Sequence, residues 1–428
     1  MPPPSSSPTA TPPQADPLAV AARGFEPRRA LVPFLSPRWA MLLAIIASAA
    51  VVGFAFGALI PLIAILMERA GYSAGMIGAN AAASTLAILV LAPMTPRIAR
   101  RIGTLPALYL GIALIALPTL LFPFWTGFTG WFVLRFIAGI GVAIHWVLSE
   151  TWVNYLAEAR NRGKVIALYV TVLASGFALG PMVITLTDLD TGWPFWTIGL
   201  ATIAAALPLF VLVRRAPDLS GHDTGAFRHI LRVAPIVVLA GFLAGIADNA
   251  SFVQLPVYGL MTDTGERFAL AMISVFVAGS ILLQWPLGWL ADRFDKARVL
   301  TAVAAGGAVG ALTLPFVSGS VLLWPHLLVW GGLAIGLYSL SLALLGSVFG
   351  PGDLARANAV FIFAYNAGNF IGPIAGGVAM DRIGATGLPM VLFTVYAGLA
   401  VGAALMASHR HRRLPPPPAM PGNLPGND

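Results

Sequence analysis

Long apolar stretches, separated by short polar segments, fill the chain from residue 39 to residue 407. A transmembrane helix needs about 20 mainly apolar residues. The stretches are continuously apolar rather than alternating, which favours helices over the strands of a membrane barrel. They predict an all-α integral membrane protein with twelve transmembrane helices, at 39–67, 75–96, 105–125, 130–156, 165–187, 194–213, 233–260, 268–290, 298–319, 323–349, 357–380 and 385–407.

Composition supports a chain that is surrounded by lipid. Of its 428 residues, 58% are hydrophobic and only 10% are charged, whereas soluble domains carry about 25% charged residues. The apolar surface therefore has to face a lipid bilayer. Residues 1–37 and 409–428 are rich in proline and lack long apolar stretches, so we expect a disordered cytoplasmic tail at each end.

The basic residues are distributed unevenly between the two sides of the membrane. If the loops are assigned alternately, 21 of the 25 lysines and arginines fall on the side of the N-terminus and three on the other side, and Arg135 lies inside a helix. Cytoplasmic loops carry the excess of basic residues in membrane proteins. We therefore expect a multi-pass protein of the bacterial cytoplasmic (inner) membrane with both termini in the cytoplasm. The net charge of +8 then reflects topology, and no nucleic-acid partner is expected.

The two halves of the chain repeat with an offset of 192 residues, as from Gly180 to Gly372. With this offset Pro181 aligns with Pro373 and Arg101 with Arg293. Each half holds six predicted helices, so equivalent helices cross in the same direction. Parallel repeats are typical of transporters that bind substrate between the halves. The pattern predicts an N-terminal six-helix bundle (38–213), a cytoplasmic linker (214–232) and a C-terminal six-helix bundle (233–408), related by a pseudo-two-fold axis.

Several short motifs in these halves resemble those of a known family. The segment "GWLADRFDKAR" (288–298) resembles the loop signature between helices 2 and 3 of the major facilitator superfamily, and "RFIAGIGVA" (135–143) resembles its helix-4 signature. "GFALGP" (176–181) resembles the helix-5 signature linked to antiporters, and "SETWVN" and "LPVYGL" are similar to the YcaD-like branch. The resemblance covers about residues 38–408 and implies a transporter. The first-half loop departs from the family pattern at Pro96 and Arg100.

One base and two acids lie inside the predicted helices. Arg135 and Glu150 share one face of the fourth helix with Trp146 and Asn154. The two charges are about 22 Å apart along the helix, so they cannot pair with each other. Asp248 lies near mid-depth in the seventh helix, and none of the three charges is repeated in the other half. A charge in the bilayer core costs at least ~3 kcal/mol, so each should face the bundle interior.

These three charges admit different interpretations. Arg135 could pair with an acid or with helix-end carbonyls, assist proton coupling, or bind an anionic substrate, and Asp248 is its leading candidate partner, directly or through water. Asp248 itself could relay protons, contact a cationic substrate, or make an internal hydrogen bond. Glu150 could line the cavity or brace the cytoplasmic gate with Asn154.

Aromatic and amide side chains are candidates for the wall of a substrate cavity. Trp146 and Tyr338 are equivalent in the repeat, so they should face the same space. For each aromatic residue the alternative is packing or lipid contact. The remaining candidates are Phe56, Asn249, Gln254, Tyr365, Asn366 and Asn369.

The gating candidates are Arg101, Asp292, Arg293, Gly180, Pro181, Gly372 and Pro373. The charged group is either a solvated topology signal or a latch, in which Asp292 caps a helix or pairs with a base while the cytoplasmic side is closed. A first-half latch would need an acid from elsewhere, such as Glu158. The glycine–proline pairs provide either tight packing or bending points.

No phosphate-binding loop, metal-binding cluster or hydrolase motif is found in the sequence. We therefore expect no enzyme activity, no metal and no cofactor. The predicted function is secondary active transport by alternating access of a small amphiphilic or apolar solute by a monomer, with proton-coupled efflux preferred. The alternatives are a facilitator or proton-symport importer of a small metabolite, and a non-transporting membrane receptor or scaffold.

Overall fold

The computed structural model describes residues 37–158, 162–211, 230, 235–349 and 351–413. The predicted N-terminal tail and nearly all of the linker lie outside the described residues, as does the C-terminal tail beyond residue 413. The first half contains α2 (Pro37–Arg69), α3 (Ala74–Leu91), α4 (Thr95–Ile102), α5 (Thr104–Leu121), α6 (Phe128–Leu156), α7 (Arg162–Ile184) and α8 (Trp193–Ala204). The second half contains α10 (Pro235–Met261), α11 (Glu266–Arg293), α12 (Lys296–Val317), α13 (Leu323–Val348), α14 (Pro351–Ile383) and α15 (Gly387–Arg413).

The prediction of an all-helical membrane protein is confirmed. Eleven stretches of the described chain are long and apolar enough to cross a membrane, and the last, Arg356–Ser408, has 53 residues. A single helix of that length would extend about 80 Å, far beyond a ~30 Å hydrocarbon core. The turn Gly384–Thr386 divides it into α14 and α15. The eleven stretches therefore provide twelve membrane crossings.

Prolines account for two places where the helix limits differ from prediction. The predicted helix 194–213 ends as α8 at Ala204, and a 3₁₀ turn begins at Pro208. The predicted helix 75–96 is interrupted by the 3₁₀ turn Ala92–Met94, after which the separate short helix α4 begins. Proline lacks the backbone N–H that would continue an α-helix, so the chain bends at both positions.

The internal repeat is visible in the helix limits and in the packing. The helices α3 and α11 begin at residues 74 and 266, and α5 and α12 begin at residues 104 and 296, each pair 192 residues apart. The helix α2 packs against α7 in the first half, as α10 packs against α14 in the second.

Small residues permit this close packing. A Cβ atom added at Gly180 would lie within 3.0 Å of the Phe54 carbonyl oxygen, and one at Gly372 within 3.0 Å of the Ile246 carbonyl oxygen. Helices in lipid associate through such close contacts because the hydrophobic effect does not distinguish a neighbouring helix from a lipid chain. These glycines therefore provide tight packing between helices, which is one of their two predicted roles. Their role as bending points, with Pro181 and Pro373, stays a prediction.

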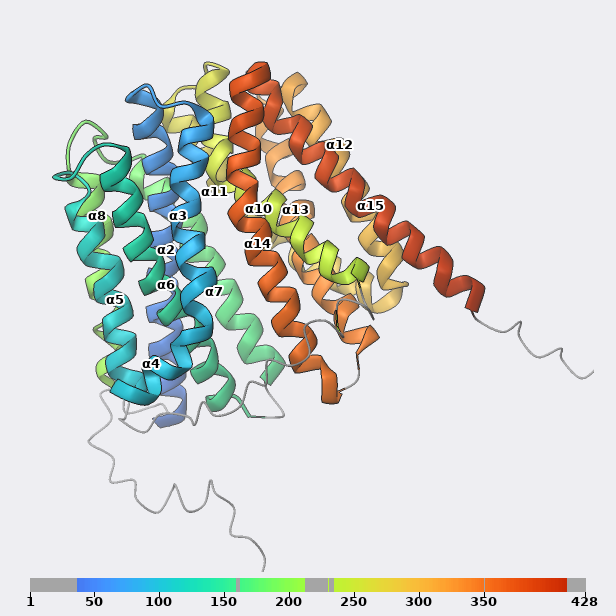
Figure 1. The fold of residues 1–428 in the computed structure, drawn as a ribbon, viewed down its shortest axis with the longest axis horizontal. Helices are drawn as coiled ribbons and strands as arrows, with labels where there is room; N and C mark the ends of the chain where they lie inside the picture. The colour runs from blue at the N-terminus through green and yellow to red at the C-terminus, as the bar shows by residue number, and fades with distance from the viewer. Residues whose placement is uncertain (1–36, 159–161, 212–229, 231–234, 350, 414–428) are drawn as a thin grey trace, which may run out of the picture.

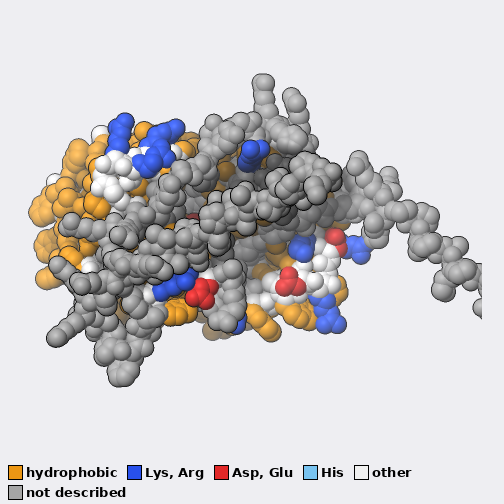
Figure 2. All heavy atoms as spheres, turned by 90° about the horizontal axis from the view of Figure 1, so that it is seen from below, with side chains coloured by type: hydrophobic (Ala, Val, Ile, Leu, Met, Phe, Trp, Pro, Cys, Tyr) orange, Lys and Arg blue, Asp and Glu red, His pale blue; other side chains and the backbone are white. Residues whose placement is uncertain are grey.

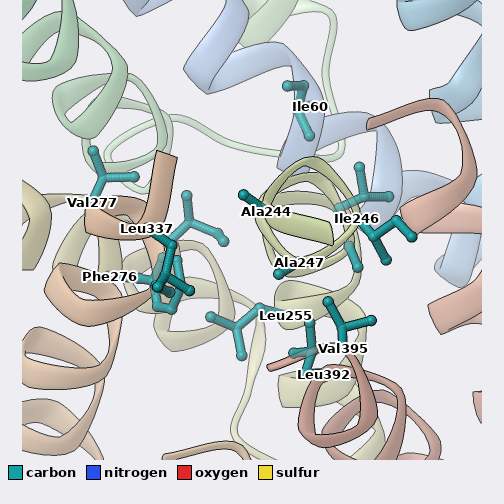
Figure 3. Close-up of a cluster of buried hydrophobic side chains, with 14 of the residues drawn as sticks. Ile60, Ala244, Ile246, Ala247, Leu255, Phe276, Val277, Leu337, Leu392 and Val395 are labelled. Carbon is teal, nitrogen blue, oxygen red and sulfur yellow. The ribbon is translucent and has the colours of Figure 1, made fainter. Parts of the chain in front are cut away.

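The helix α10 lies at the centre of the largest hydrophobic core (Figure 3). Its residues Ala244 and Ala247 are buried among apolar side chains from α2, α11, α13 and α15. Asp248 follows Ala247 directly and is buried as well, with 1% of its surface exposed.

The two halves approach each other at one end of the bundle and diverge toward the other (Figure 1). They meet where α3 packs against α14 and α7 against α11. We call the diverging end the basic end, because it carries Arg38, Arg97, Arg101, Arg293 and Arg298, and the other the opposite end. Figure 2, which views the molecule from the basic end, shows lysine and arginine side chains beside hydrophobic ones, together with a few acidic side chains.

Candidate functional site

Asp248 on α10 is almost completely enclosed, with 1% of its surface exposed. Its Oδ2 atom accepts a hydrogen bond of 2.9 Å from the Tyr365 hydroxyl on α14. Within the described residues, Oδ1 has no hydrogen-bond partner and Asp248 takes part in no ion pair. The internal hydrogen bond predicted as one alternative is therefore present, but it satisfies only one of the two carboxyl oxygens.

Arg135 on α6 is equally enclosed, with 2% of its surface exposed. Its guanidinium donates a hydrogen bond of 3.0 Å to the backbone carbonyl of Ile60 on α2. Of the two predicted forms of an Arg135–Asp248 pair, the direct one is therefore wrong, and the one through water stays a prediction. The arginine lies within the first half against α2, whereas Asp248 is held by Tyr365 in the second half, so each side chain uses the partner that its own bundle offers.

Glu150 lies on α6 toward the basic end, on the same helix face as Trp146. The residue is exposed, and so is Trp146, one helical turn earlier on α6, with 47% of its surface exposed. The α6 face that carries Arg135 is therefore buried at Arg135 and exposed at Trp146 and Glu150, toward the basic end.

An aromatic group connects this region to Asp248. The Tyr338 ring lies 4.5 Å from the Tyr365 ring and 5.6 Å from the Phe361 ring, measured between centroids. The Tyr365 hydroxyl in turn binds Asp248. Tyr338 therefore lies beside the Tyr365–Asp248 pair.

Phe56 takes part in a second aromatic chain, which crosses between the halves. Its ring is 6.2 Å from Phe177 of α7, and Phe177 is 5.0 Å from Phe252 of α10. These contacts bury part of the interface between the halves near the level of Asp248.

Charged residues at the opposite end join the two halves. Arg69, at the end of α2, forms ion pairs with Glu266 at the start of α11 and, at 2.8 Å, with Asp190. Asp381, near the end of α14, accepts hydrogen bonds of 2.8 Å from the Ser73 hydroxyl and 3.0 Å from the Gly75 backbone N–H at the start of α3.

This polar group was not predicted from the sequence, in which Arg69 is one of the three basic residues on the side away from the N-terminus. One signal was available, because an acid such as Asp381 in the last turn of a helix is unfavourable next to the negative end of the helix dipole. It therefore required a partner elsewhere, and the positive N-terminal end of α3 provides it.

Comparisons with known proteins place this arrangement in a family. The family model of the major facilitator superfamily matches residues 45–344 and 237–426. The chain belongs to the major facilitator superfamily. It is therefore a membrane transporter and not an enzyme, as the sequence analysis predicted.

Relatives of this transporter confirm the resemblance to the YcaD-like branch. The chain is 27% identical over 366 residues to the MFS-type transporter YfkF of Bacillus subtilis, covering 82% of this chain and 92% of YfkF. It is 26% identical over 330 residues to the MFS-type transporter YcaD of Escherichia coli, covering 76% of this chain and 84% of YcaD. Both relatives are described as uncharacterized.

The fold also matches solved structures of the superfamily. A bacterial homologue of the human lysosomal transporter Spinster, in an inward-facing and occupied conformation, superposes with a TM-score of 0.71 at 13% identity. The match covers 90% of this chain and all of the other one. At this identity the likeness concerns the fold alone.

The amide side chains predicted for substrate binding are engaged by the transporter's own helices. Asn249 donates to the Asn369 carbonyl oxygen at 2.6 Å and to the Thr85 hydroxyl at 3.3 Å. Gln254 donates to the carbonyl oxygens of Ala74 at 3.0 Å and Pro373 at 2.8 Å. Both therefore brace α10 against helices of each half. A similar local bond links the side-chain amide of Asn366 to the Ile362 carbonyl oxygen, and that of Asn154 to the Glu150 carbonyl oxygen.

The charges predicted as cytoplasmic latches have other roles here. The α12 helix is capped by Asp295, whose carboxylate accepts from the Arg298 N–H at 3.0 Å. The latch role of Asp292 concerns a closed basic end and stays a prediction. Arg293 lies over the Trp289 ring, 5.4 Å from its centroid. Glu158 pairs with Arg38 at 3.3 Å and not with the first-half loop that carries Arg101.

Proposed function

We propose that this transporter is a proton-coupled exporter of a small amphiphilic or apolar solute, acting as a monomer in the bacterial cytoplasmic membrane. We further propose that its basic end faces the cytoplasm. The excess of basic residues at that end supports this orientation, because cytoplasmic loops carry more lysine and arginine than outer ones.

The state of Asp248 is the single observation that carries the coupling proposal. One of its oxygens is bonded to Tyr365 and the other has no partner among the described residues, while 1% of the residue's surface is exposed. A buried charge without a partner costs several kcal/mol, and a proton removes that cost. A carboxyl that takes up and releases a proton near the middle of the membrane is the element that proton coupling requires.

The contacts at the opposite end support a cycle of alternating access. Arg69 and Asp381 hold the halves together at that end, while the exposed face with Trp146 and Glu150 lies toward the basic end. In our proposal this is the inward-facing state, and export requires these contacts to break. When the basic end closes, Arg101, Asp292 and Arg293 form its latch, and the glycine–proline pairs of α7 and α14 permit the helices to bend.

Flux across proteoliposomes tests this function. The purified transporter is reconstituted, and the movement of the neutral dye Nile red and of the cationic dye ethidium is followed with and without a pH gradient. We expect the gradient to drive flux of at least one dye in the intact chain and Asp248→Asn to abolish that drive, since an amide cannot exchange the proton.

Asp263→Asn is the matched control for this substitution. Asp263 is exposed between α10 and α11 with a φ of 55°, a conformation that asparagine tolerates. It should transport like the intact chain. Gradient-driven flux that survives Asp248→Asn would refute the coupling role, and flux that ignores the gradient would point to a facilitator. No flux of any solute under any gradient would favour a receptor or scaffold.

A further inference from the structure

We propose that the short helix α4 at the basic end binds the headgroup of an anionic phospholipid, with the guanidinium groups of Arg97, Arg100 and Arg101 around its phosphate. The acyl chains of this lipid lie against the exposed apolar side chains next to α4. The site is separate from the space between the halves, and it depends neither on the solute that is transported nor on the direction of transport.

The position of α4 is the first step. The helix α3 has 18 residues and extends about 27 Å, which is most of the thickness of the hydrocarbon core. The chain then bends at Pro93 and Pro96, and Figure 1 shows α4 lying across the basic end between the ends of α3 and α5. In the second half, α11 continues through the equivalent positions to Arg293 without a break. The separate helix α4 therefore lies at the level of the lipid headgroups.

The arrangement of the three arginines is the second step. Arg97 is three residues from Arg100 and four from Arg101, and residues with these spacings are neighbours on a helix surface. All three side chains are exposed. Within the described part of the chain none of them takes part in an ion pair. The helix therefore presents three adjacent positive charges to an outside partner.

The internal repeat shows that the fold does not require this charge. With the offset of 192 residues, Arg97 aligns with Trp289 and Arg100 with Asp292. The second-half segment 289–298 combines Asp292 and Asp295 with three basic residues, whereas the equivalent segment 97–106 contains no acid. The same connection between two helices is thus of mixed charge in one half and purely basic in the other, which points to a task other than folding.

The apolar residues next to α4 favour a lipid over a soluble anion. Val90, Met94 and Ile102 have 51%, 45% and 46% of their surface exposed. A soluble phosphate gains nothing from such neighbours, whereas a phospholipid contacts them with its acyl chains. Guanidinium groups bind phosphate oxygens through paired hydrogen bonds, and basic segments next to a transmembrane helix attract anionic lipids. A zwitterionic lipid offers the same phosphate but no net charge.

Native mass spectrometry of the purified full-length transporter tests this site, because it resolves the number of lipids that each transporter binds. Cardiolipin, phosphatidylglycerol and phosphatidylcholine are titrated separately. We expect both anionic lipids to bind at least about fivefold more tightly than phosphatidylcholine, since each basic residue near an anionic lipid adds to the attraction. For the same reason Arg97→Gln combined with Arg100→Gln should lower the affinity for the anionic lipids at least about fivefold. Arg101 is kept in this variant because of its proposed role in the latch.

Lys296→Gln combined with Arg298→Gln is the matched control, because it removes the same charge from the equivalent connection of the second half. It should leave the affinity for the anionic lipids nearly unchanged. Arg100→Asp gives α4 the acid that stands at the equivalent position, and it should abolish the preference for anionic lipids. Equal affinity of the intact chain for all three lipids would overturn the inference. So would an equal loss in the two double variants, or no loss in an α4 variant that unfolds at the normal temperature.

Competition with sn-glycerol 3-phosphate separates a lipid from a soluble phosphate ester. This compound carries the phosphate without acyl chains, so it should not displace cardiolipin at equal concentration. Displacement would overturn the lipid as occupant and leave the arginines as a site for a soluble phosphate ester.

Discussion

Asp248 and Arg135 are both buried in the bundle but obtain their hydrogen bonds from different kinds of partner. The sequence was sufficient to identify both as interior groups, because each is a charge inside a long apolar stretch. It was not sufficient to identify their partners. The partner of Arg135 is the backbone carbonyl of Ile60, and every residue has such a carbonyl, so no side-chain pattern could single it out.

The hydroxyl of Tyr365 provides a prediction at this scale. Tyr365→Phe removes the only described donor to Asp248 and leaves both carboxyl oxygens unsatisfied. Losing one such bond to a buried group costs about 1–3 kcal/mol. We expect a lower temperature of thermal unfolding for this variant in detergent.

Tyr155→Phe is the control for that measurement. Tyr155 lies on α6 with 51% of its surface exposed, so losing its hydroxyl should change the unfolding temperature little. If Tyr365→Phe unfolds at the same temperature as Tyr155→Phe, the Tyr365–Asp248 hydrogen bond does not contribute measurably to stability.

At the scale of the helices, hydrophobic length and the repeat predicted most of the architecture. The limits of α5 and α6 lie within a few residues of the predicted 105–125 and 130–156. The shortening of α8 was missed because residues 205–213 remain apolar, and hydrophobicity alone does not reveal that the chain leaves the α-helix near Pro208. The glycines at repeat-equivalent positions correctly predicted close helix contacts. Such a contact needs only a small residue at that position and no particular side-chain partner.

Gly372 allows a prediction at the scale of the helices. Gly372→Ala places a Cβ atom within 3.0 Å of the Ile246 backbone, so α14 has to move away from α10. Overpacking of this kind typically costs 1–3 kcal/mol. We expect a lower unfolding temperature together with weaker gradient-driven flux, because the same helix pair carries Tyr365 and Asp248.

Gly346→Ala on α13 is the matched control. No heavy atom lies within 4 Å of the added Cβ there. Alanine is a better helix former than glycine by up to about 1 kcal/mol, so this variant should be at least as stable as the intact chain. Equal effects of the two substitutions would show that the packing between α10 and α14 is not the cause.

At the scale of the whole molecule, the contacts at the opposite end join the two halves. They join residues far apart in the chain, such as Ser73 and Asp381, and neither belongs to a recognisable motif. Sequence periodicity describes each helix separately, so it could predict the two bundles but not which end of the pair is closed. The exposed position of Glu150 depends on the same arrangement.

Removing one of these contacts should shift the balance between the two states. Asp381→Ala deletes the acceptor for Ser73 and for the Gly75 N–H, both at the start of α3. Hydrogen bonds to a charged group contribute about 1.5–3 kcal/mol, and less where exposed. A loss of about 1.4 kcal/mol changes the ratio of the states tenfold. We therefore expect the opposite end to open more often.

Spin labels can measure this opening directly, because the chain has no native cysteine. Thr187→Cys and Arg267→Cys place labels on the two halves beside a cavity of about 410 Å³ at the opposite end, where there is room for them. In the doubly labelled Asp381→Ala transporter, the distance distribution should gain a longer component. Glu68→Ala removes an acid of α2 at the same end and should leave the distance distribution unchanged. An identical distribution in both variants would mean that the Asp381 contacts follow closure of this end and do not stabilise it.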